Sequence, residues 1–162
     1  MVNIKVSQTG LINPPGVTPV LTLDQMWRGL VYKSREPQKF VAAVEHRDIV
    51  SEHDNGLTRI EYFKPGLGPP AGKVTGDCEY WAPHRTTFSV RGSGEVVINI
   101  ISTDLDDPSI LYLTFCIDWP HPAIQAGSSE ETEMFAKRQG MIKQIVRQTI
   151  DVIREMVKSG EL

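Results

Sequence analysis

The sequence predicts an α+β fold in which a curved, antiparallel, seven-stranded sheet wraps around a long C-terminal helix. Residues 128–158 carry apolar side chains at intervals of three and four, which is typical of one long amphipathic helix. Residues 45–119 change to a two-residue period interrupted by turn signals, which indicates consecutive strands. No linker or repeat divides the 162 residues, so we expect one domain over 1–162.

The N-terminal segment is expected to supply one strand and two short helices. Val2 to Ser7 alternates apolar and polar residues, which predicts a half-buried strand. Thr22 and Gln25 have the spacing of a capping box at the start of the first helix. Pro37 suits the first turn of the second helix. The apolar residues on one face of the first helix are Leu23, Met26, Trp27, Leu30 and Val31.

Six strand-like runs follow, at about 45–54, 57–64, 73–82, 85–91, 95–104 and 110–119. The dipeptide Asn55-Gly56 is a tight-turn signal, and a two-residue loop there places Glu52 opposite Arg59. In that register Tyr62 lies on the inner face of the sheet.

The loops between the last three strands decide which residues face the core. A three-residue loop at 92–94 and a six-residue loop at 104–109 together predict one apolar inner face. The opposite, wetter face then includes Val97 and Asn99. The inner face holds Phe88, Val90, Val96, Ile98, Ile100, Leu111, Leu113, Phe115 and Ile117.

The C-terminal helix has clear start and stop signals. Ser128 and Glu131 fit a second capping box, and Gly160 suits the end of the helix. A helix of this length is about 45 Å long and needs a large apolar surface to pack against. The predicted sheet provides that surface.

This order of elements matches the helix-grip architecture of the birch-pollen-allergen and START-type superfamily, often called SRPBCC. Three segments carry a closer resemblance: Trp27-x-Gly29-Leu30-x-x-Lys33-x-Arg35-x-Pro37, Thr114-Phe115-x-x-Asp118-Trp119-x-His121-Pro122, and Gly127-Ser128. On these segments the sequence resembles the AtaL-like family of small proteins within that superfamily, many of which are encoded in fungal biosynthetic gene clusters. Asp118 stands where that family tends to have Glu. The resemblance implies a ligand cavity.

Composition excludes several classes of function. The net charge of −3, with both signs interspersed, does not favour nucleic-acid binding. No apolar run is long enough to cross a membrane, and the first ten residues lack the pattern of a signal peptide. Cys78 and Cys116 form neither a metal-ligand spacing nor a disulfide framework. We therefore expect a cytoplasmic protein with no metal and no cofactor.

The segment Gly66 to Lys73 superficially resembles a phosphate-binding loop. It has Leu67 where that motif needs glycine, and Val74 where it needs serine or threonine. We interpret it as a hairpin loop, with gating of a cavity mouth as the alternative.

Glu79 is the first acid–base candidate, and its orientation depends on the following loop. A four-residue loop at 82–85 turns Glu79 and Trp81 inward, where burial would raise the pKa of the carboxyl group. A three-residue loop turns Cys78 and Tyr80 inward instead and leaves Glu79 in solvent. The second alternative is the favoured one.

Asp118 and His121 are the other acid–base candidates. His121 follows Asp118 closely and lies between two prolines, so it could shuttle a proton near neutral pH. Alternatively, this segment only seats the connection into the last helix. Because no metal, nucleotide or nucleophile-triad motif is found, proton transfer by Glu79, Asp118 or His121 is the chemistry that remains.

Aromatic and apolar residues on the expected inner faces would line the cavity, with a few polar anchors among them. These residues are Trp27, Tyr62, Trp81, Thr86, Phe88, Phe115, Trp119 and Ile142.

The favoured function is cofactor-free cyclisation, dehydration or isomerisation of a hydrophobic or aromatic intermediate in secondary-metabolite biosynthesis. The alternatives are a carrier that binds such a ligand without chemistry, and a structural or co-chaperone interaction domain. A hydrophobic small molecule is the expected partner, and the sequence leaves open whether the protein is a homodimer.

Overall fold

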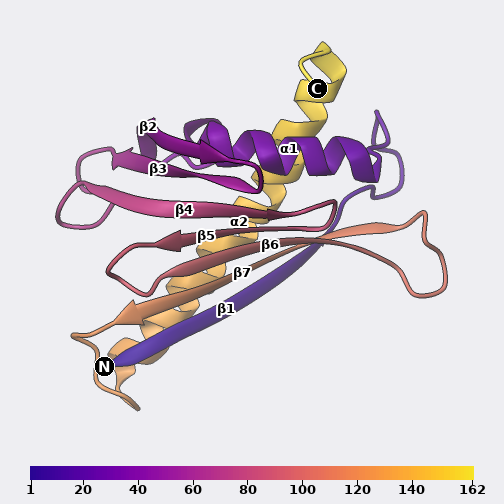
Figure 1. Ribbon diagram of the computed structural model, residues 1–162. Coiled ribbons are helices and arrows are strands. Elements are labelled where there is room, and N and C mark those ends of the chain that lie inside the picture. Colours follow the sequence, from indigo (N-terminus) through magenta and orange to yellow (C-terminus); the bar gives the residue numbers. More distant parts are fainter.

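A seven-stranded antiparallel sheet curves around the long C-terminal helix in the computed structural model, which describes residues 1–162 (Figure 1). The fold class expected from the sequence is therefore confirmed. The elements in order are β1 (Val2–Leu11), α1 (Leu23–Arg35), the 3-10 helix η1 (Pro37–Lys39), β2 (Val44–His53), β3 (Gly56–Phe63), β4 (Lys73–Trp81), β5 (Arg85–Val90), β6 (Val96–Thr103), β7 (Leu111–His121) and α2 (Ser129–Ser159).

The strands β2 to β7 form a meander, and β1 pairs with β7 at one edge of the sheet. The strand order is β1-β7-β6-β5-β4-β3-β2. In Figure 1, α2 runs behind the concave side of this sheet and α1 crosses near its β2–β3 end. Neither helix contains an apolar stretch long enough to span a bilayer.

The predicted helix boundaries agree with the caps in the structure. Thr22 and Gln25 form the complete capping box of α1. The Ser128 hydroxyl accepts the backbone N–H of Glu131 at the start of α2, and Gly160 ends α2 in the left-handed conformation with φ of 79°. The second short helix is only one turn, because the chain turns at the fully buried Phe40 and enters β2 at Val44.

The predicted β2–β3 register is wrong. His53 pairs with Gly56, so the turn is Asp54-Asn55 and not Asn55-Gly56. Gly56 belongs to the strand, where a Cβ would lie 1.9 Å from the carbonyl oxygen of Cys78 on β4. The glycine is therefore needed for the close approach of β4. With a further register shift between Ile49 and Ser51, Arg59 pairs with Ile49 rather than Glu52.

The predicted inner face of β6 is also wrong. Phe88 pairs with Val97, and Val90 donates its N–H to the carbonyl oxygen of Glu95, so the β5–β6 register differs by one residue from the expected one. Because side chains alternate along a strand, this shift turns Val97 and Asn99 inward. The β6–β7 register also differs by one residue from the expected one, with Thr103 opposite Leu111. The two one-residue shifts cancel, so the side chains of β7 face as predicted.

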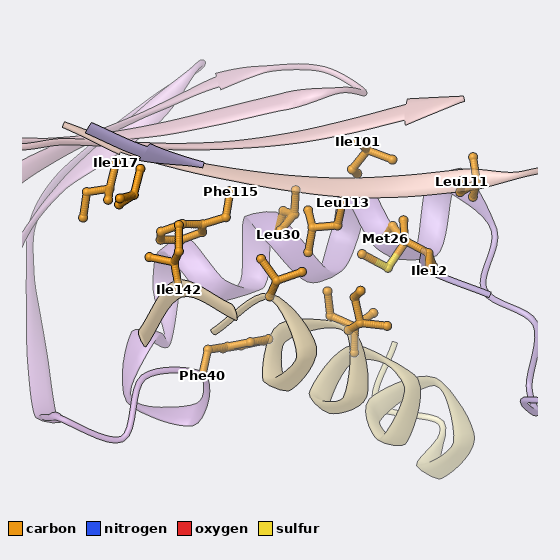
Figure 2. Close-up of a cluster of buried hydrophobic side chains, with 14 of the residues drawn as sticks. Ile12, Met26, Leu30, Phe40, Ile101, Leu111, Leu113, Phe115, Ile117 and Ile142 are labelled. Carbon is orange, nitrogen blue, oxygen red and sulfur yellow. The ribbon is translucent and has the colours of Figure 1, made fainter. Parts of the chain in front are cut away.

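The main hydrophobic core lies where α2 packs against β1 and β7. It contains 19 buried residues from β1, α1, β6, β7, α2 and the connecting segments. Figure 2 shows Phe115 and Leu113 projecting from β7 toward the helices, with Ile142 and Leu30 among the residues that they approach. A second, smaller cluster lies at the other end of the sheet and consists of Leu57, Cys78, Phe88 and Val90.

Candidate functional site

A cavity of about 460 Å³ separates the two hydrophobic clusters. Its walls are the inner faces of β3 to β7, one side of α1 and the N-terminal half of α2. Of its 29 lining residues, 15 are hydrophobic, so polar groups form a large minority of the wall. The β3–β4 loop closes one side of the cavity with Leu67, Gly68, Pro69 and Pro70.

Four of the residues expected in the cavity do line it. They are Thr86, Phe88, Phe115 and Trp119. Phe88 lies across Gly76 of the neighbouring strand, where a Cβ would be 2.4 Å from the ring. The missing side chain of Gly76 therefore makes room for this aromatic wall.

A buried amine lies at the α1 end of the cavity. Lys33 is only 9% exposed, and its Nζ donates hydrogen bonds to Asn99 Oδ1 at 3.2 Å and to Thr149 Oγ1 at 3.0 Å. The same nitrogen lies 5.0 Å from the centroid of the Phe115 ring. Burial, reinforced by the positive charge of Arg59, lowers the pKa of the Lys33 amine from 10.5 to about 7.

A buried ion pair on β3 forms the adjacent wall. Arg59 and Glu61 are both 6% exposed and are two residues apart, so they share the inner face of the strand. The Arg59 guanidinium also donates to the carbonyl oxygen of Ser34 and lies 4.2 Å from the centroid of the Phe88 ring. Because its charge is paired, Glu61 is fixed in the wall.

A second ionisable cluster lies at the other end, where the β5–β6 hairpin meets α2. Glu95 lines the cavity together with Trp119 and Arg138, whose guanidinium lies 3.3 Å from the centroid of the indole ring. Burial raises the pKa of the Glu95 carboxyl from 4.5 to about 7, and the nearby Arg138 opposes this rise only in part. The cavity therefore has one group that titrates near neutral pH at each end.

The structure does not place the predicted acid–base residues in the cavity. Glu79 is exposed on the outer face, because Trp81 pairs with Arg85 and the favoured three-residue loop is the observed one. Asp118 also faces outward and lies 3.4 Å from Lys5 of β1. His121 lies beside Trp119, at 6.2 Å between ring centroids, but is not among the lining residues. Burial and the charge of Arg138 lower the pKa of the His121 imidazole.

Four residues that were expected to line the cavity lie elsewhere. Tyr62 stacks on His46 and donates to Asp48 on the outer face, because Arg59 and Glu61 take the inner face of β3. Trp81 is 42% exposed at the end of β4. Trp27 packs edge-on against Tyr80. Ile142 is fully buried in the core, whereas Met141 and Ile145 of the same helix line the cavity.

Neither end of the cavity has the residues of a metal or thiol site. No group of three or more His, Cys, Asp or Glu side chains is close enough to hold a metal ion. Burial raises the pKa of the Cys78 thiol to about 11, so this cysteine stays protonated near neutral pH. The ionisable groups available to a ligand are therefore the amine, the carboxyl and the guanidinium groups described above.

Comparison with known families gives a match over most of the chain. Residues 6–160 match the family model described as "AtaL: Acetylaranotin biosynthesis cluster protein L". A search of curated protein sequences finds no match.

Two solved structures with similar folds are aromatase/cyclases. The Zhui aromatase/cyclase from Streptomyces sp. R1128 superposes with a TM-score of 0.66 at 13% identity, over 96% of each chain. The di-domain aromatase/cyclase StfQ from the steffimycin biosynthetic pathway superposes with a TM-score of 0.67 at 6% identity. That match covers 98% of this chain and 52% of StfQ, so this chain spans about half of the di-domain protein. At these identities, the likeness shows a shared fold.

Proposed function

The chain belongs to the AtaL family of biosynthetic cluster proteins, and from this premise we propose that it is a cofactor-free enzyme of secondary-metabolite biosynthesis. Its cavity binds a hydrophobic or aromatic intermediate, of polyketide-like or peptide-derived type. The reaction is a proton-transfer step that leads to cyclisation, dehydration or isomerisation.

The observation that carries this proposal is Glu95, a carboxyl group with a pKa of about 7 in the wall of a cavity that is about half apolar. An acid–base catalyst is most effective when its pKa lies near the operating pH, because it can then both accept and return a proton. Arg138 and the Trp119 indole lie beside it and can orient the substrate group that reacts. These three residues form the proposed acid–base end of the cavity.

The size and walls of the cavity support an aromatic intermediate as the ligand. Small-molecule sites usually have volumes of about 300–1,000 Å³, and the cavity of about 460 Å³ falls within that range. Phe88 and Phe115 offer flat apolar surfaces, and Lys33 offers a polar anchor at the opposite end from Glu95. The two structural neighbours are named as aromatase/cyclases, and ring closure is a reaction that fits these walls.

Accumulation of an intermediate provides the test. The gene for this chain is deleted in its host, the intermediate that accumulates is purified, and the protein is incubated with it in the presence of a metal chelator. We expect conversion by the wild-type protein and a loss of about 10²–10⁴-fold in kcat for Glu95→Gln. Glu79→Gln, the same substitution on the outer face, is the matched control and should leave turnover unchanged.

Two outcomes would contradict the proposal. Tight binding of the intermediate without conversion would identify a carrier. Equal turnover of wild type and Glu95→Gln would remove the carboxyl group from the mechanism.

A further inference from the structure

We propose that Lys33 is an amine nucleophile that forms an imine with a carbonyl group of the substrate, so that the cavity is built for ketones or aldehydes. The inference rests on the proposed function only in placing the substrate in this cavity.

The surroundings of Lys33 support a reactive amine rather than a buried cation. It lines the cavity, and Glu61, which is bound to Arg59, forms no ion pair with it, so the attraction of Glu61 offsets the effect of burial only in part. Its two hydrogen-bond partners, Asn99 and Thr149, are neutral. A buried ammonium group without a counter-ion is strongly disfavoured, whereas a neutral amine is tolerated.

The neutral form has the electron pair that nucleophilic attack requires. With a pKa of about 7, roughly half of the Lys33 side chains are unprotonated at neutral pH. A neutral amine has two N–H donors and one lone pair. If Asn99 and Thr149 accept the two N–H groups, the lone pair stays free for a ligand in the cavity. Desolvation and a neighbouring cation, here Arg59, are the two features that activate lysine nucleophiles.

The chemistry balances without an additional reagent. The neutral amine attacks the carbonyl carbon, a C–N bond forms, and the carbonyl oxygen becomes a hydroxyl group after proton transfer from nitrogen. Loss of that hydroxyl as water, with one proton from solvent, breaks the C–O bond and leaves an iminium ion. Overall, one amine, one proton and one carbonyl give one iminium and one water.

An iminium at Lys33 would activate the substrate for ring closure. It withdraws electrons from the neighbouring carbon and so makes that carbon easier to deprotonate. Asn99 of β6, which holds Lys33, and Glu95, the residue before β6, are four residues apart and both line the cavity, which corresponds to about 13 Å along an extended chain. A substrate that reaches both groups is therefore an extended carbonyl compound, with its reactive carbonyl at the α1 end.

The probe for this inference is 1-phenyl-1,3-butanedione, a hydrophobic 1,3-diketone that condenses with unprotonated amines to give a conjugated enaminone. We expect one new near-ultraviolet chromophore per chain and a mass increase equal to the probe minus one water, located on Lys33 by peptide mapping. Labelling should have its pH midpoint near 7. At pH 7 it should exceed the labelling of any exposed lysine by about 10²–10³-fold, because exposed lysines are almost fully protonated there.

Three variants separate a nucleophile from a structural lysine. Lys33→Met should lose the chromophore, and Lys33→Arg should lose it while keeping a positive charge. Lys73→Met, which removes an exposed lysine of β4, should label like wild type. If neither Lys33 variant folds, the peptide map of the wild-type protein still gives the answer.

The outcomes are distinct from those of the turnover assay. Labelling spread over several lysines, or no labelling of Lys33, would overturn the imine even if the intermediate is converted. Labelling of Lys33 without turnover of the natural intermediate would support the amine chemistry and contradict the proposed enzyme function.

Discussion

The two ends of this sheet carry the same alternating strands but are covered differently. At the β1–β7 end, α2 lies directly on the strands, and apolar side chains fill the space between them (Figures 1 and 2). At the β3–β5 end, only four buried hydrophobic residues form a cluster, and the cavity lies between them and the helices. We call the first the packed region and the second, which surrounds the cavity, the hollow region.

The difference shows where the fold can hold polar groups. Of the four buried charged residues, Arg59 and Glu61 line the hollow region and Lys33 lies between the two regions. The fourth, Arg154, lies outside the cavity and donates to the carbonyl oxygens of Ile12 and Pro19. Lys33, Arg59 and Glu61 are held by hydrogen bonds or an ion pair within the cavity wall. A protein that needed only stability would fill this space with apolar side chains, so the hollow region is where function is expected.

The largest effect is expected from a charge in the packed region. Ile153 is fully buried and packs so closely on α1 that a Cβ at Gly29 would lie 2.5 Å from it. Ile153→Asp should therefore unfold the protein, because the new charge would be buried at a tightly packed position. Ile145 lines the cavity, so Ile145→Asp should retain a cooperative melting transition at a lower temperature. Thermal unfolding followed by circular dichroism compares the two variants. An equal loss of melting temperature in both would mean that the two regions do not differ energetically.

The next largest effect is expected at the ion pair of the hollow region. Arg59→Met leaves Glu61 buried without a partner and should cost about 3–5 kcal/mol of unfolding free energy. Arg59→Met combined with Glu61→Leu should recover most of that loss, because the unpaired charge is removed as well. Urea unfolding of the single and double variants measures the coupling. Strictly additive effects would show that the two side chains do not depend on each other.

The sequence was sufficient to predict the packed region. Its apolar residues recur at regular intervals in α1, β7 and α2, and the capping residues Thr22 and Ser128 mark where the helices begin. Packing and capping are local patterns, so they can be recognised without knowing which strands pair.

The hollow region could not be predicted in the same way, because its inner faces are partly polar. With Arg59, Glu61 and Asn99 facing inward, apolar alternation no longer shows which face is buried, and a one-residue error in the β5–β6 loop reverses the assignment of β6. The β5–β6 shift hid Glu95, which the expected register placed opposite Arg91 on the outer face, whereas Glu79 lies outward as the favoured loop predicted. One signal did exist: Lys33 continues the buried face of Met26 and Leu30 at the next interval of three, where a charged residue is unexpected.

The third prediction is that removing the Lys33 amine stabilises the protein. Between about pH 7 and 10.5 the unfolded chain binds a proton at Lys33 that the folded chain does not, so stability should rise with pH in this window. Lys33→Met should flatten that rise and increase the free energy of unfolding near pH 7 by on the order of 3–5 kcal/mol. Urea unfolding of wild type and Lys33→Met at pH 7, 8.5 and 10 measures this pH dependence of the unfolding free energy. An unchanged pH profile would mean that the amine is solvated and keeps its ordinary pKa.

The smallest effect is expected at Glu95, and it has the opposite sign. Between about pH 4.5 and 7 the folded protein retains a proton on Glu95 that the unfolded chain has lost, so stability should fall as the pH rises through this window. Glu95→Gln should remove this fall, which amounts to on the order of 1–2 kcal/mol because part of the side chain meets solvent.

Urea unfolding at pH 4.5, 5.5 and 7 provides the measurement for Glu95, with the exposed Glu79→Gln as the control that should leave the profile unchanged. Identical slopes for wild type and Glu95→Gln would show that this carboxyl ionises normally. If both this slope and the rise above pH 7 are found, wild-type stability has a minimum near pH 7, where Lys33 and Glu95 are each partly charged. The hollow region would then be least stable in the pH range where both groups can take part in proton transfer and amine chemistry.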